Sequence, residues 1–600
     1  MAEHEASSTS DGEAKKKKRR RKKKKAGGGA TTVASAGTTS SIAMAPGPKG
    51  TVRVIFLGGL GEIGRNCAAI EVDGQIIVLD CGIMFPEPDM PGVDLVLPDF
   101  SYLFERADQV AGIVLTHGHE DHTGGLPFLL RGVSAPIYGS AFTLGLARHR
   151  IDEAGLAHRT EFIAVGDHER VRIGGIEVEF IPVTHSVPHA MAIAFHTPQG
   201  VVMHSGDFKL DLSPVDGRRT DLSRMGELAK TEGVRLLLAD STNAEHEGHT
   251  GSESDVGRVL RATMAARPGK RMVVACFASH IHRVQQIIDA AVASGRKVAT
   301  LGRSMAKNVE LAKEMGIISF PEGTLVDIRH VDDLPDGEVC IVSTGSQGEP
   351  MSALTLMAAG RSKWLKLSDR DVVIISAHPI PGNEWGVGKV IDGLHRQGAE
   401  VVHSEHEHVH VSGHASRGEL RTLISVTSPE CFIPVHGEYR HMSHHLELAR
   451  SMGIAESKSM QCADGSVVEL NAEGIRALPS IPAPYQFVDG NVDDVEHGVV
   501  RDRKLLAEEG MVMVICTVDL HSSQIVAGPT IESKGWVFAA EAEGFEAEAT
   551  AAVRKAIEAA LEDRVQDADL LAREARRALG RYIGRRTRRR PMVVPVIVAT

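Results

Sequence analysis

The sequence lacks the features that would place a chain in a membrane or in an oxidising compartment. No apolar run approaches the ~20 residues that a membrane span needs, and the charged N-terminus is not followed by the apolar stretch of a signal peptide. The seven cysteines form no Cys-x-x-Cys pair and mostly lie within apolar runs, as buried, reduced thiols do. We therefore expect a cytoplasmic protein with no membrane partner.

Large aromatic rings are also scarce, and beyond residue 50 acidic side chains outnumber basic ones. With 3 Trp and 5 Tyr, any stacking of nucleobases would depend on few rings. Residues 1–50 hold 12 of the 67 Lys and Arg but only 4 of the 78 Asp and Glu, so the rest of the chain carries a formal charge of −19. A chain of this charge can bind nucleic acid only by concentrating positive charge locally.

The N-terminal 48 residues have the composition of a disordered tail. Ser, Thr, Ala and Gly surround an unbroken basic block at residues 15–25. An RNA tether and a nonspecific solubility or localisation tail both fit this block.

The most specific pattern is the segment THGHEDH at residues 116–122, directly after the apolar run GIVL. It offers four potential metal ligands at a strand end, and Gly118 lets a short loop turn them inward. The four are His117, His119, Asp121 and His122. Imidazole and carboxylate are the ligands of catalytic zinc sites that keep a position free for water.

Three further ligands each end an apolar run of their own, namely His185, Asp207 and His436. Seven ligands are too many for one tetrahedral ion, so the sequence predicts two metals. We expect His117, His119 and His185 on one ion and Asp121, His122 and His436 on the other, with Asp207 bridging. Such a pair can clamp both oxygens of a phosphoryl displacement.

A glycine-rich segment at residues 59–64 satisfies the dinucleotide-binding pattern G-x-G-x-x-G, with Asp80 at the distance of a ribose-binding acid. That site needs a helix next. Here the strand-like residues 67–72 run into the turn signal Asp73-Gly74 and another apolar run, which predicts a β-hairpin. We therefore reject the dinucleotide hypothesis.

Six hundred residues are too many for one core and indicate three or four domains. Short strands with interposed helices fill residues 52–240. Helices at 255–266 and 281–293 then alternate with strands at 271–276, 298–301, 339–343 and 372–376, as in an inserted parallel sheet. A Pro-, Ala- and Asp-rich segment at 479–494 precedes a helix near 546–561 and a closing strand at 592–598.

Several segments together resemble the ribonuclease J family. The metal ligands resemble the metallo-beta-lactamase fold, and LLLADST (236–242), VSGHA (411–415) and IPVHGEYR (433–440) resemble motifs A, B and C of its beta-CASP nucleic-acid processing branch. The segments GGLGEIGRN (58–66) and TGSQGEP (344–350) narrow the resemblance to bacterial ribonuclease J, over residues 50–600.

The resemblance implies an α/β architecture, a metallo-beta-lactamase αββα sandwich with an inserted parallel-sheet beta-CASP domain and a small C-terminal α/β domain. Residues 1–48 would be the tail, 49–250 and 417–480 the two parts of the sandwich domain, 251–416 the beta-CASP domain, 481–497 a linker and 498–600 the C-terminal domain.

Phosphodiester hydrolysis needs a nucleophile, charge neutralisation and a proton for the leaving oxygen. Two Zn²⁺ per subunit, with Mn²⁺ or Mg²⁺ as alternatives, would supply the first two. Asp121 would orient the nucleophile. The resemblance points to His414 as the proton donor and to Asp240 as its partner, although Asp240 could instead cap a helix.

The resemblance also implies a pocket for a 5'-monophosphate, one nucleotide from the metals. Small residues allow close approach of backbone N–H groups to an anion, which favours Gly345, Ser346, Ser412, Gly413 and His414. In addition, Phe277 could stack a base or belong to the core, and Arg283 could contact phosphate. His280 stands where relatives would have Asn.

Two charged tracts, at residues 403–410 and 573–590, are each explained more simply by local structure than by a functional site. The alternating histidines and glutamates at residues 403–410 could form a third metal site, but strict alternation favours an extended strand with one polar face. The nine arginines between residues 573 and 590 predict a solvated helix face and a basic loop, and RNA or subunit contact is the alternative.

Taken together, the sequence predicts a zinc-dependent ribonuclease with 5'-to-3' exonuclease and endonuclease activity, acting in RNA maturation and decay. We expect RNA with 5'-monophosphate ends as substrate, a homodimer or homotetramer, and partners from an RNA-degradation complex. The residues leave DNA open as a substrate. The alternatives are a hydrolase of a small ester or lactam, which would not need the inserted domain, and a non-catalytic RNA-binding scaffold, which would not need the full ligand set.

Overall fold

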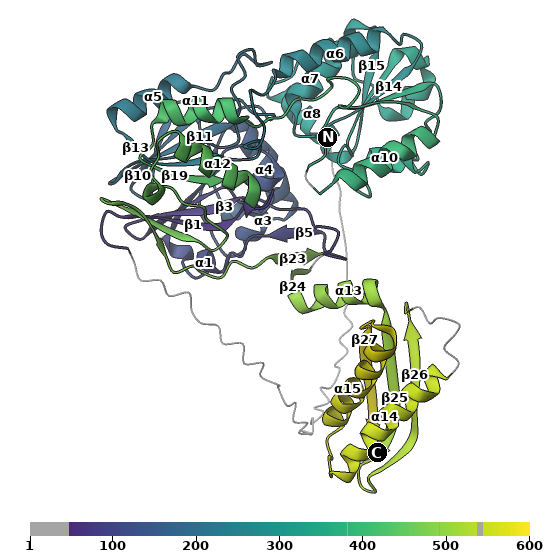
Figure 1. Cartoon of the computed structure of the whole chain (residues 1–600). Coiled ribbons are helices and arrows are strands. Elements are labelled where there is room, and N and C mark those ends of the chain that lie inside the picture. The colour runs from purple at the N-terminus through teal and green to yellow at the C-terminus, as the bar shows by residue number, and fades with distance from the viewer. Residues whose placement is uncertain (1–46, 381, 491, 537–543) are drawn as a thin grey trace, which may run out of the picture. The chain divides into compact units, whose positions relative to one another are not determined.

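A computed structural model describes residues 47–380, 382–490, 492–536 and 544–600 of the chain (Figure 1). The tail predicted at residues 1–48 lies almost entirely outside these residues. No helix in the described ranges combines the length and the apolar character needed to cross a bilayer. All seven cysteines are buried and free, which confirms the prediction made for them.

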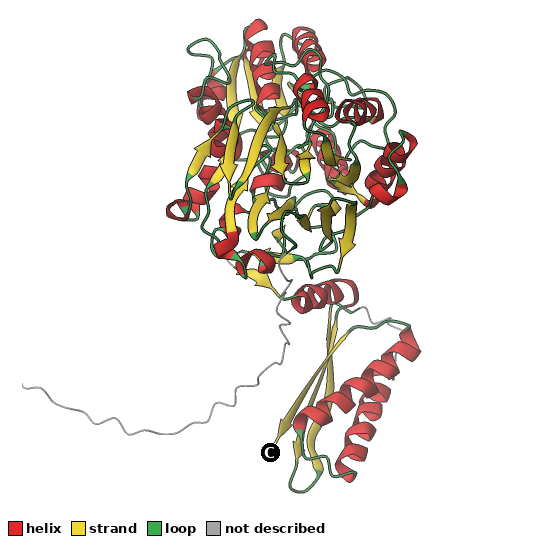
Figure 2. Cartoon of the chain, turned by 90° about the vertical axis from the view of Figure 1, so that its left-hand side faces the viewer, coloured by secondary structure: helices red, strands yellow, loops and turns green. Residues whose placement is uncertain are grey.

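Two β-sheets face each other and form a sandwich (Figures 1 and 2). The first sheet consists, in spatial order, of β22 (Gly474–Leu478), β21 (Val467–Asn471), β1 (Val52–Gly58), β3 (Cys67–Val72), β4 (Gln75–Leu79), β6 (Val110–Val114), β7 (Ile137–Gly139) and β8 (Phe162–Ala164). The second consists of β19 (Cys431–Val435), β13 (Val234–Asp240), β12 (Gly200–His204), β11 (Met191–Thr197), β10 (Ile176–Pro182) and β9 (Arg170–Ile173). Buried side chains of both sheets, such as Phe56, Ile77, Phe180 and Phe195, pack in one cluster between them.

Helices complete the layers of the sandwich. The outer face of the second sheet packs against α5 (Leu222–Thr231), α11 (Arg417–Thr427) and α12 (Tyr439–Ser451), through Met225, Leu423 and Leu448 among others. Beside the first sheet the chain forms α1 (Ser101–Phe104), α2 (Glu120–Thr123), α3 (Leu126–Leu129) and α4 (Ala141–Glu153). A short parallel pair, β2 (Leu60–Gly61) and β20 (Gly437–Glu438), joins the loops at one end.

The second body is a fully parallel sheet with the order β15 (Lys297–Leu301), β16 (Val339–Ser343), β14 (Arg271–Ala275), β17 (Asp371–Ile375) and β18 (Glu400–Val402). Alternate residues of its strands point to opposite faces, because side chains alternate along a strand. One face packs against α6 (Glu253–Ala265), α7 (Ile281–Ala293) and α8 (Arg303–Glu314), and the other against α9 (Ala353–Ala358) and α10 (Glu384–Arg396). The helices and strands predicted for this domain are confirmed within one or two residues.

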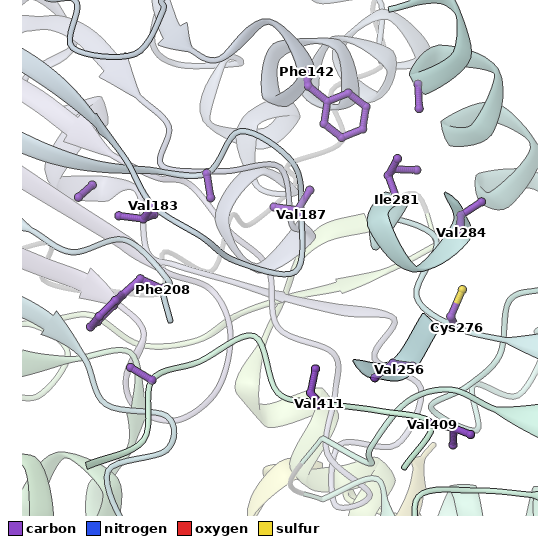
Figure 3. Packing of buried hydrophobic residues seen from close by; sticks show 14 of the residues in the cluster. Phe142, Val183, Val187, Phe208, Val256, Cys276, Ile281, Val284, Val409 and Val411 are labelled. Atoms are coloured by element: carbon purple, nitrogen blue, oxygen red, sulfur yellow. The ribbon is translucent and has the colours of Figure 1, made fainter. Parts of the chain in front are cut away.

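One apolar cluster continues from the outer face of the sandwich into the parallel-sheet domain (Figure 3). Phe208 and Val183 come from the sandwich, whereas Ile281 and Val284 come from α7. Residues of both bodies therefore belong to one cluster of buried apolar side chains.

The chain returns from the inserted domain to the sandwich at α11. Ser416 and Glu419 form a capping box that starts this helix at Arg417. Strand β19 then pairs in parallel with β13, and Val435 lies opposite Asp240. Segments almost two hundred residues apart in sequence thereby end at the same edge of the sandwich.

The predicted linker forms strands of its own. β23 (Gln486–Asp489) pairs with β5 (Leu95–Leu97) and with β24 (Val492–Val495), and α13 (His497–Glu509) follows. The C-terminal part has a sheet with the order β26 (Gln524–Lys534), β25 (Met511–Asp519) and β27 (Met592–Ala599), packed on α14 (Phe545–Glu562) and α15 (Ala568–Thr587). The predicted fold class, a sandwich with an inserted parallel sheet and a C-terminal α/β domain, is confirmed.

The histidine-rich tract at residues 403–410 is a correction. It is not an extended strand, because β18 ends at Val402 and the chain then turns, with the N–H of His406 donating to the carbonyl of His403 at 2.9 Å. The ring centroids of His403 and His406 lie 4.2 Å apart, with the two ring planes tilted by 55°. Within the described residues, the metal-binding clusters all lie elsewhere.

Candidate metal centre

The first four predicted ligands lie in the loop after β6, which carries His117 and His119, and in the short helix α2, which carries Asp121 and His122. His117 and His122 are buried, and His119 precedes α2 in an extended conformation. A Cβ on Gly118 would lie 2.6 Å from Leu146 Cδ1 of α4, so a side chain there would require Leu146 to move. The glycine thus lets the loop lie close to α4.

One donor set gathers His117, His119, His185 and Asp207. His119 Nδ1 lies 3.1 Å from His117 Nε2 and 3.2 Å from His185 Nε2. Asp207 Oδ2 lies 3.5 Å from His117 Nε2 and 3.7 Å from His185 Nε2. This is the grouping predicted for the first ion.

The second donor set gathers Asp121, His122, Asp207 and His436. Asp121 Oδ2 and Asp207 Oδ2 each lie 3.4 Å from both His122 Nε2 and His436 Nε2. Asp207 Oδ2 therefore belongs to both sets, which is the position expected of a bridging ligand.

The donor atoms fit divalent ions. Four ligands at 2.0–2.1 Å in a tetrahedron stand about 3.3 Å apart, close to the separations in both sets. Among the described residues, Asp207 Oδ1 is buried and accepts no hydrogen bond, so the carboxylate retains capacity for a further ligand. Burial lowers the pKa of His117 and of His185, and brings that of His119 to about 4, which favours the neutral ring that binds a metal.

Electrostatic interactions between its histidines and carboxylates also stabilise the second donor set. Burial opposes a charged ring at His122 and His436, but the nearby carboxylates outweigh it and raise the pKa of both, with Asp207 contributing most. In the same way, burial opposes the ionised form of Asp207, but His436 and His122 outweigh it and hold the pKa of Asp207 well below its ordinary value. The carboxylates thus favour positive charge at this place, which a divalent ion would supply instead of the ring protons.

Each of the five histidines also forms a hydrogen bond through its other ring nitrogen, as metal-binding histidines do. The partners are Thr116 Oγ1 for His117 (3.0 Å), Ser186 Oγ for His119 (3.3 Å), Asp80 Oδ2 for His122 (2.8 Å), the Gly413 carbonyl for His185 (2.9 Å) and Thr242 Oγ1 for His436 (2.7 Å). These contacts orient the rings. Sequence reasoning assigned none of these roles, and it considered Asp80 only as a ribose-binding acid.

Asn66 is another residue that the sequence did not single out for the site. Its side-chain amide donates to the Asp121 carbonyl at 3.1 Å and lies 3.5 Å from Asp121 Oδ2. The glycine-rich segment before it leads into the hairpin of β3 and β4, with positive φ at Asp73 and Gly74. The hairpin confirms that this segment is not a dinucleotide site.

Asp240 and His414 lie beside the second donor set. His414 Nδ1 is 2.8 Å from Asp240 Oδ2, and Asp240 Oδ1 accepts hydrogen bonds from the backbone N–H and hydroxyl of Thr242. The next helix, α6, begins only at Glu253, so Asp240 caps a turn and not a helix. Burial opposes a charged ring at His414, but Asp240 outweighs it and raises the pKa of His414.

Family models match four consecutive parts of the chain. They are the metallo-beta-lactamase superfamily (residues 60–255), the ribonuclease J beta-CASP domain (269–394), the Zn-dependent metallo-hydrolase RNA specificity domain (400–457) and the ribonuclease J C-terminal domain (498–600).

Curated relatives match nearly the whole chain. Ribonuclease J 1 of Streptococcus pyogenes is 38% identical over 93% of this chain and 99% of its own length. Ribonuclease J2 of Bacillus subtilis is 38% identical over 91% and 98%, and ribonuclease J of Mycobacterium tuberculosis is 40% identical over 92% and 98%. The chain belongs to the ribonuclease J family. Its metal loop, its inserted domain and its C-terminal domain are thus parts of one known architecture.

In this ribonuclease J family member, the residues predicted for the 5' pocket lie at two places. Gly345 follows β16 with φ 105°, and a Cβ there would lie 2.3 Å from Ser352 Oγ, while Ser346 beside it is buried. Ser412 Oγ accepts from the Asn243 amide and from the His414 N–H. A Cβ on Gly413 would lie 2.8 Å from His185 Cε1, so this glycine also makes room for a predicted metal ligand.

The other two predicted contacts differ in exposure. Phe277 follows β14 and is partly exposed. Arg283 is fully buried, and its guanidinium donates to Glu253, to Ser376 and to the Val409 carbonyl. The Glu253 carboxylate thus neutralises the charge of Arg283 inside the inserted domain. The buried guanidinium is not accessible to a phosphate in this conformation. His280 caps α7, accepting from the Arg283 N–H at 3.4 Å.

Proposed function

We propose that the protein is a two-zinc ribonuclease that degrades RNA from the 5' end and also cuts internally, in RNA maturation and decay. The observation that carries the proposal is Asp207 Oδ2, which lies 3.4 to 3.7 Å from four ring nitrogens of two donor sets. Membership of the ribonuclease J family makes the substrate RNA rather than a small ester or lactam. The full ligand set supports an enzyme rather than a scaffold.

The residues of the two sets would hold one ion each, with Asp207 between them. When bound, zinc supplies a nucleophile at neutral pH and neutralises charge on the phosphate, and Mn²⁺ or Mg²⁺ could replace it. Asp121 is placed to accept a hydrogen bond from the attacking water. Its carboxylate is part of the second set and is 29% exposed, so solvent reaches it.

His414 would donate the proton that the leaving oxygen needs. Because its Nδ1–H donates to Asp240, the proton to be transferred resides on Nε2. Asp240 raises the pKa of His414 and fixes the orientation of its ring, which favours the protonated form that a general acid needs.

A 5'-monophosphate would bind between the segments Gly345-Ser346 and Ser412-Gly413-His414, with Phe277 stacking the first base. The small residues support this assignment, because they allow an anion to approach the backbone closely. Arg283 would support the wall through Glu253 and Ser376 rather than contact the phosphate.

We further propose a cytoplasmic homodimer or homotetramer that joins other RNA-degrading proteins. The buried free cysteines support a reducing compartment. For self-association, the sheet face opposite α14 and α15 exposes Ile515 (40%), Val596 (41%) and Val598 (47%).

The decisive experiment compares 5'-end-labelled and 3'-end-labelled RNA and DNA, with and without a chelator. The proposal requires metal-dependent release of mononucleotides from the 5' end of RNA together with internal cuts. Degradation that persists after complete metal removal would contradict it.

A further inference from the structure

Trp385 is an exposed aromatic residue in the first turn of α10. Its side chain is 73% exposed, which is unusual because tryptophan is mostly buried. Gly388, one turn along the helix, adds no side chain that would cover the ring. Lys389 Nζ lies 3.3 Å from the ring centroid, so a cation lies against a ring that remains largely accessible to solvent.

The position of Trp385 in the topology distinguishes it from the other tryptophans. All strands of the inserted sheet are parallel, and α10 follows the carboxyl end of β17. Ligands of open parallel sheets bind outside the carboxyl ends of the strands. Trp364 precedes β17 and therefore lies at the opposite edge.

Hydrogen bonds connect the start of α10 to the loop that carries Gly345 and Ser346. Gln347 accepts from the Ile380 N–H at 2.7 Å and donates to the His378 carbonyl at 2.9 Å. A Cβ on Gly348 would lie 2.6 Å from the Gly386 carbonyl carbon, so the loop and the helix are in direct backbone contact next to Trp385.

The same loop carries Gly345 and Ser346, which are proposed to bind the 5'-monophosphate, and its Gly348 touches the backbone of Gly386 next to Trp385. An RNA end held at that pocket would therefore lie near the exposed indole.

We propose that Trp385, with Lys389 behind its ring, is a stacking platform for an unpaired base of the RNA strand, outside the catalytic centre. The inference rests on the proposed function for its ligand, single-stranded RNA. An indole stacks any base, and an ammonium beside it can contact the adjoining phosphate. The platform would therefore retain RNA without reading its sequence.

Fluorescence can test the contact directly, because the chain has only three tryptophans. In the full chain carrying Trp364→Phe and Trp536→Phe, emission comes from Trp385 alone. We expect a single-stranded RNA 20-mer to quench it, in chelator so that the strand stays intact. Inorganic polyphosphate should leave the emission unchanged, because it has no base.

Affinity provides the second measurement. Trp385→Ala should weaken binding of the 20-mer about five- to hundred-fold, and Trp385→Phe should restore most of it. Trp364→Ala is the matched control, since Trp364 is also exposed (39%) and lies near a lysine, with Lys363 Nζ 5.0 Å from its ring. Its removal should leave binding unchanged.

Three results would overturn the platform. They are unchanged emission at saturating RNA, equal quenching by polyphosphate, and a change in oligomeric state with Trp385→Ala at unchanged RNA affinity, which would make the indole a protein contact. None of these measurements needs catalysis. Absence of metal-dependent RNA cleavage by the unmodified protein would count against the proposed function, whereas loss of the Trp385 signal alone would count against the platform.

Discussion

Asp240 holds two rings at once: its Oδ2 lies 2.8 Å from His414 Nδ1, and its Oδ1 accepts from the hydroxyl of Thr242, which in turn contacts His436 Nδ1 at 2.7 Å. One carboxylate therefore orients both a proposed proton donor and a proposed metal ligand. The two roles of the site can be separated only by variants that change one ring at a time.

His414→Ala should keep the metal content and slow RNA cleavage by about 10²-fold or more, the usual size of a general-acid contribution. Metal analysis and turnover on the same preparation measure the two effects. His408→Ala, an exposed histidine a few residues upstream, is the control and should change neither. Loss of metal from the His414 variant would make the residue a ligand and not an acid.

Asp207→Ala should abolish exonuclease and endonuclease activity together, because its Oδ2 belongs to both donor sets. The bound metal per subunit should fall in parallel. Asp99→Asn removes a different buried carboxylate and should retain both activities. Survival of either activity in the Asp207 variant would argue against a shared bridging ligand.

Asn66→Ala should reduce metal affinity or turnover by about 10- to 100-fold, the range for residues that orient metal ligands. The reason is the hydrogen bond from its amide to the Asp121 backbone, which fixes the position of α2 between His119 and His122. A metal titration monitored together with turnover measures the effect. Wild-type affinity and wild-type turnover in this variant would reduce Asn66 to a loop residue without influence on the centre.

RNA with a 5'-monophosphate should be degraded from its end faster than the same RNA with a 5'-triphosphate. The proposed pocket is lined by Gly345, Ser346 and Ser412 and is expected to hold a single phosphate. A strand with a 5'-triphosphate must therefore first be cut internally. Release of labelled mononucleotide from the two RNAs measures the preference. Equal exonucleolytic rates would contradict the pocket assignment.

Glu179→Gln should lower the melting temperature at pH 7. Burial opposes the ionised carboxylate, but His196, Arg224 and Arg170 outweigh it and lower the pKa of Glu179 from 4.5 to about 2. A depressed carboxyl pKa stabilises the fold above the ordinary pKa, and this stability is lost as the pH falls from about 4.5 towards about 2.

The gap in melting temperature between wild type and variant should therefore narrow over that range. Melting in chelator separates this effect from metal release. Glu177→Gln, on the same strand but exposed, should show little difference at any pH. A gap that stays constant down to pH 3 would contradict the ionic origin of the stabilisation.

The sequence predicted the donor sets because each donor follows an apolar run that must be a buried strand. The contacts that orient the rings were not predictable in this way. Thr242 and His436 are 194 residues apart and His185 and Gly413 are 228 apart, so no local pattern records these pairs. They depend on which strands become neighbours in the sheet.

The burial of Arg283 and the end of strand β18 at Val402 could not be predicted from local sequence either. Arg283 was expected to contact phosphate, since nothing in its segment reveals that Glu253 meets it thirty residues away in the interior. The tract at 403–410 has the alternation of a strand, but β18 is the edge strand and the chain turns instead of extending along it. Alternation of charged residues alone, without a buried face, does not specify a strand.

If His436 holds a metal as proposed, the parallel pairing of β13 with β19 also sets when the enzyme can first act during its synthesis. The ribosome must make the whole inserted domain before it makes Cys431–Val435, the strand that carries His436 to the centre. Until then β13 has an open edge and one donor set lacks a ring. A growing chain on the ribosome therefore lacks part of the proposed metal centre until most of its residues have been made. Before that point it could not cleave the messenger RNA that encodes it.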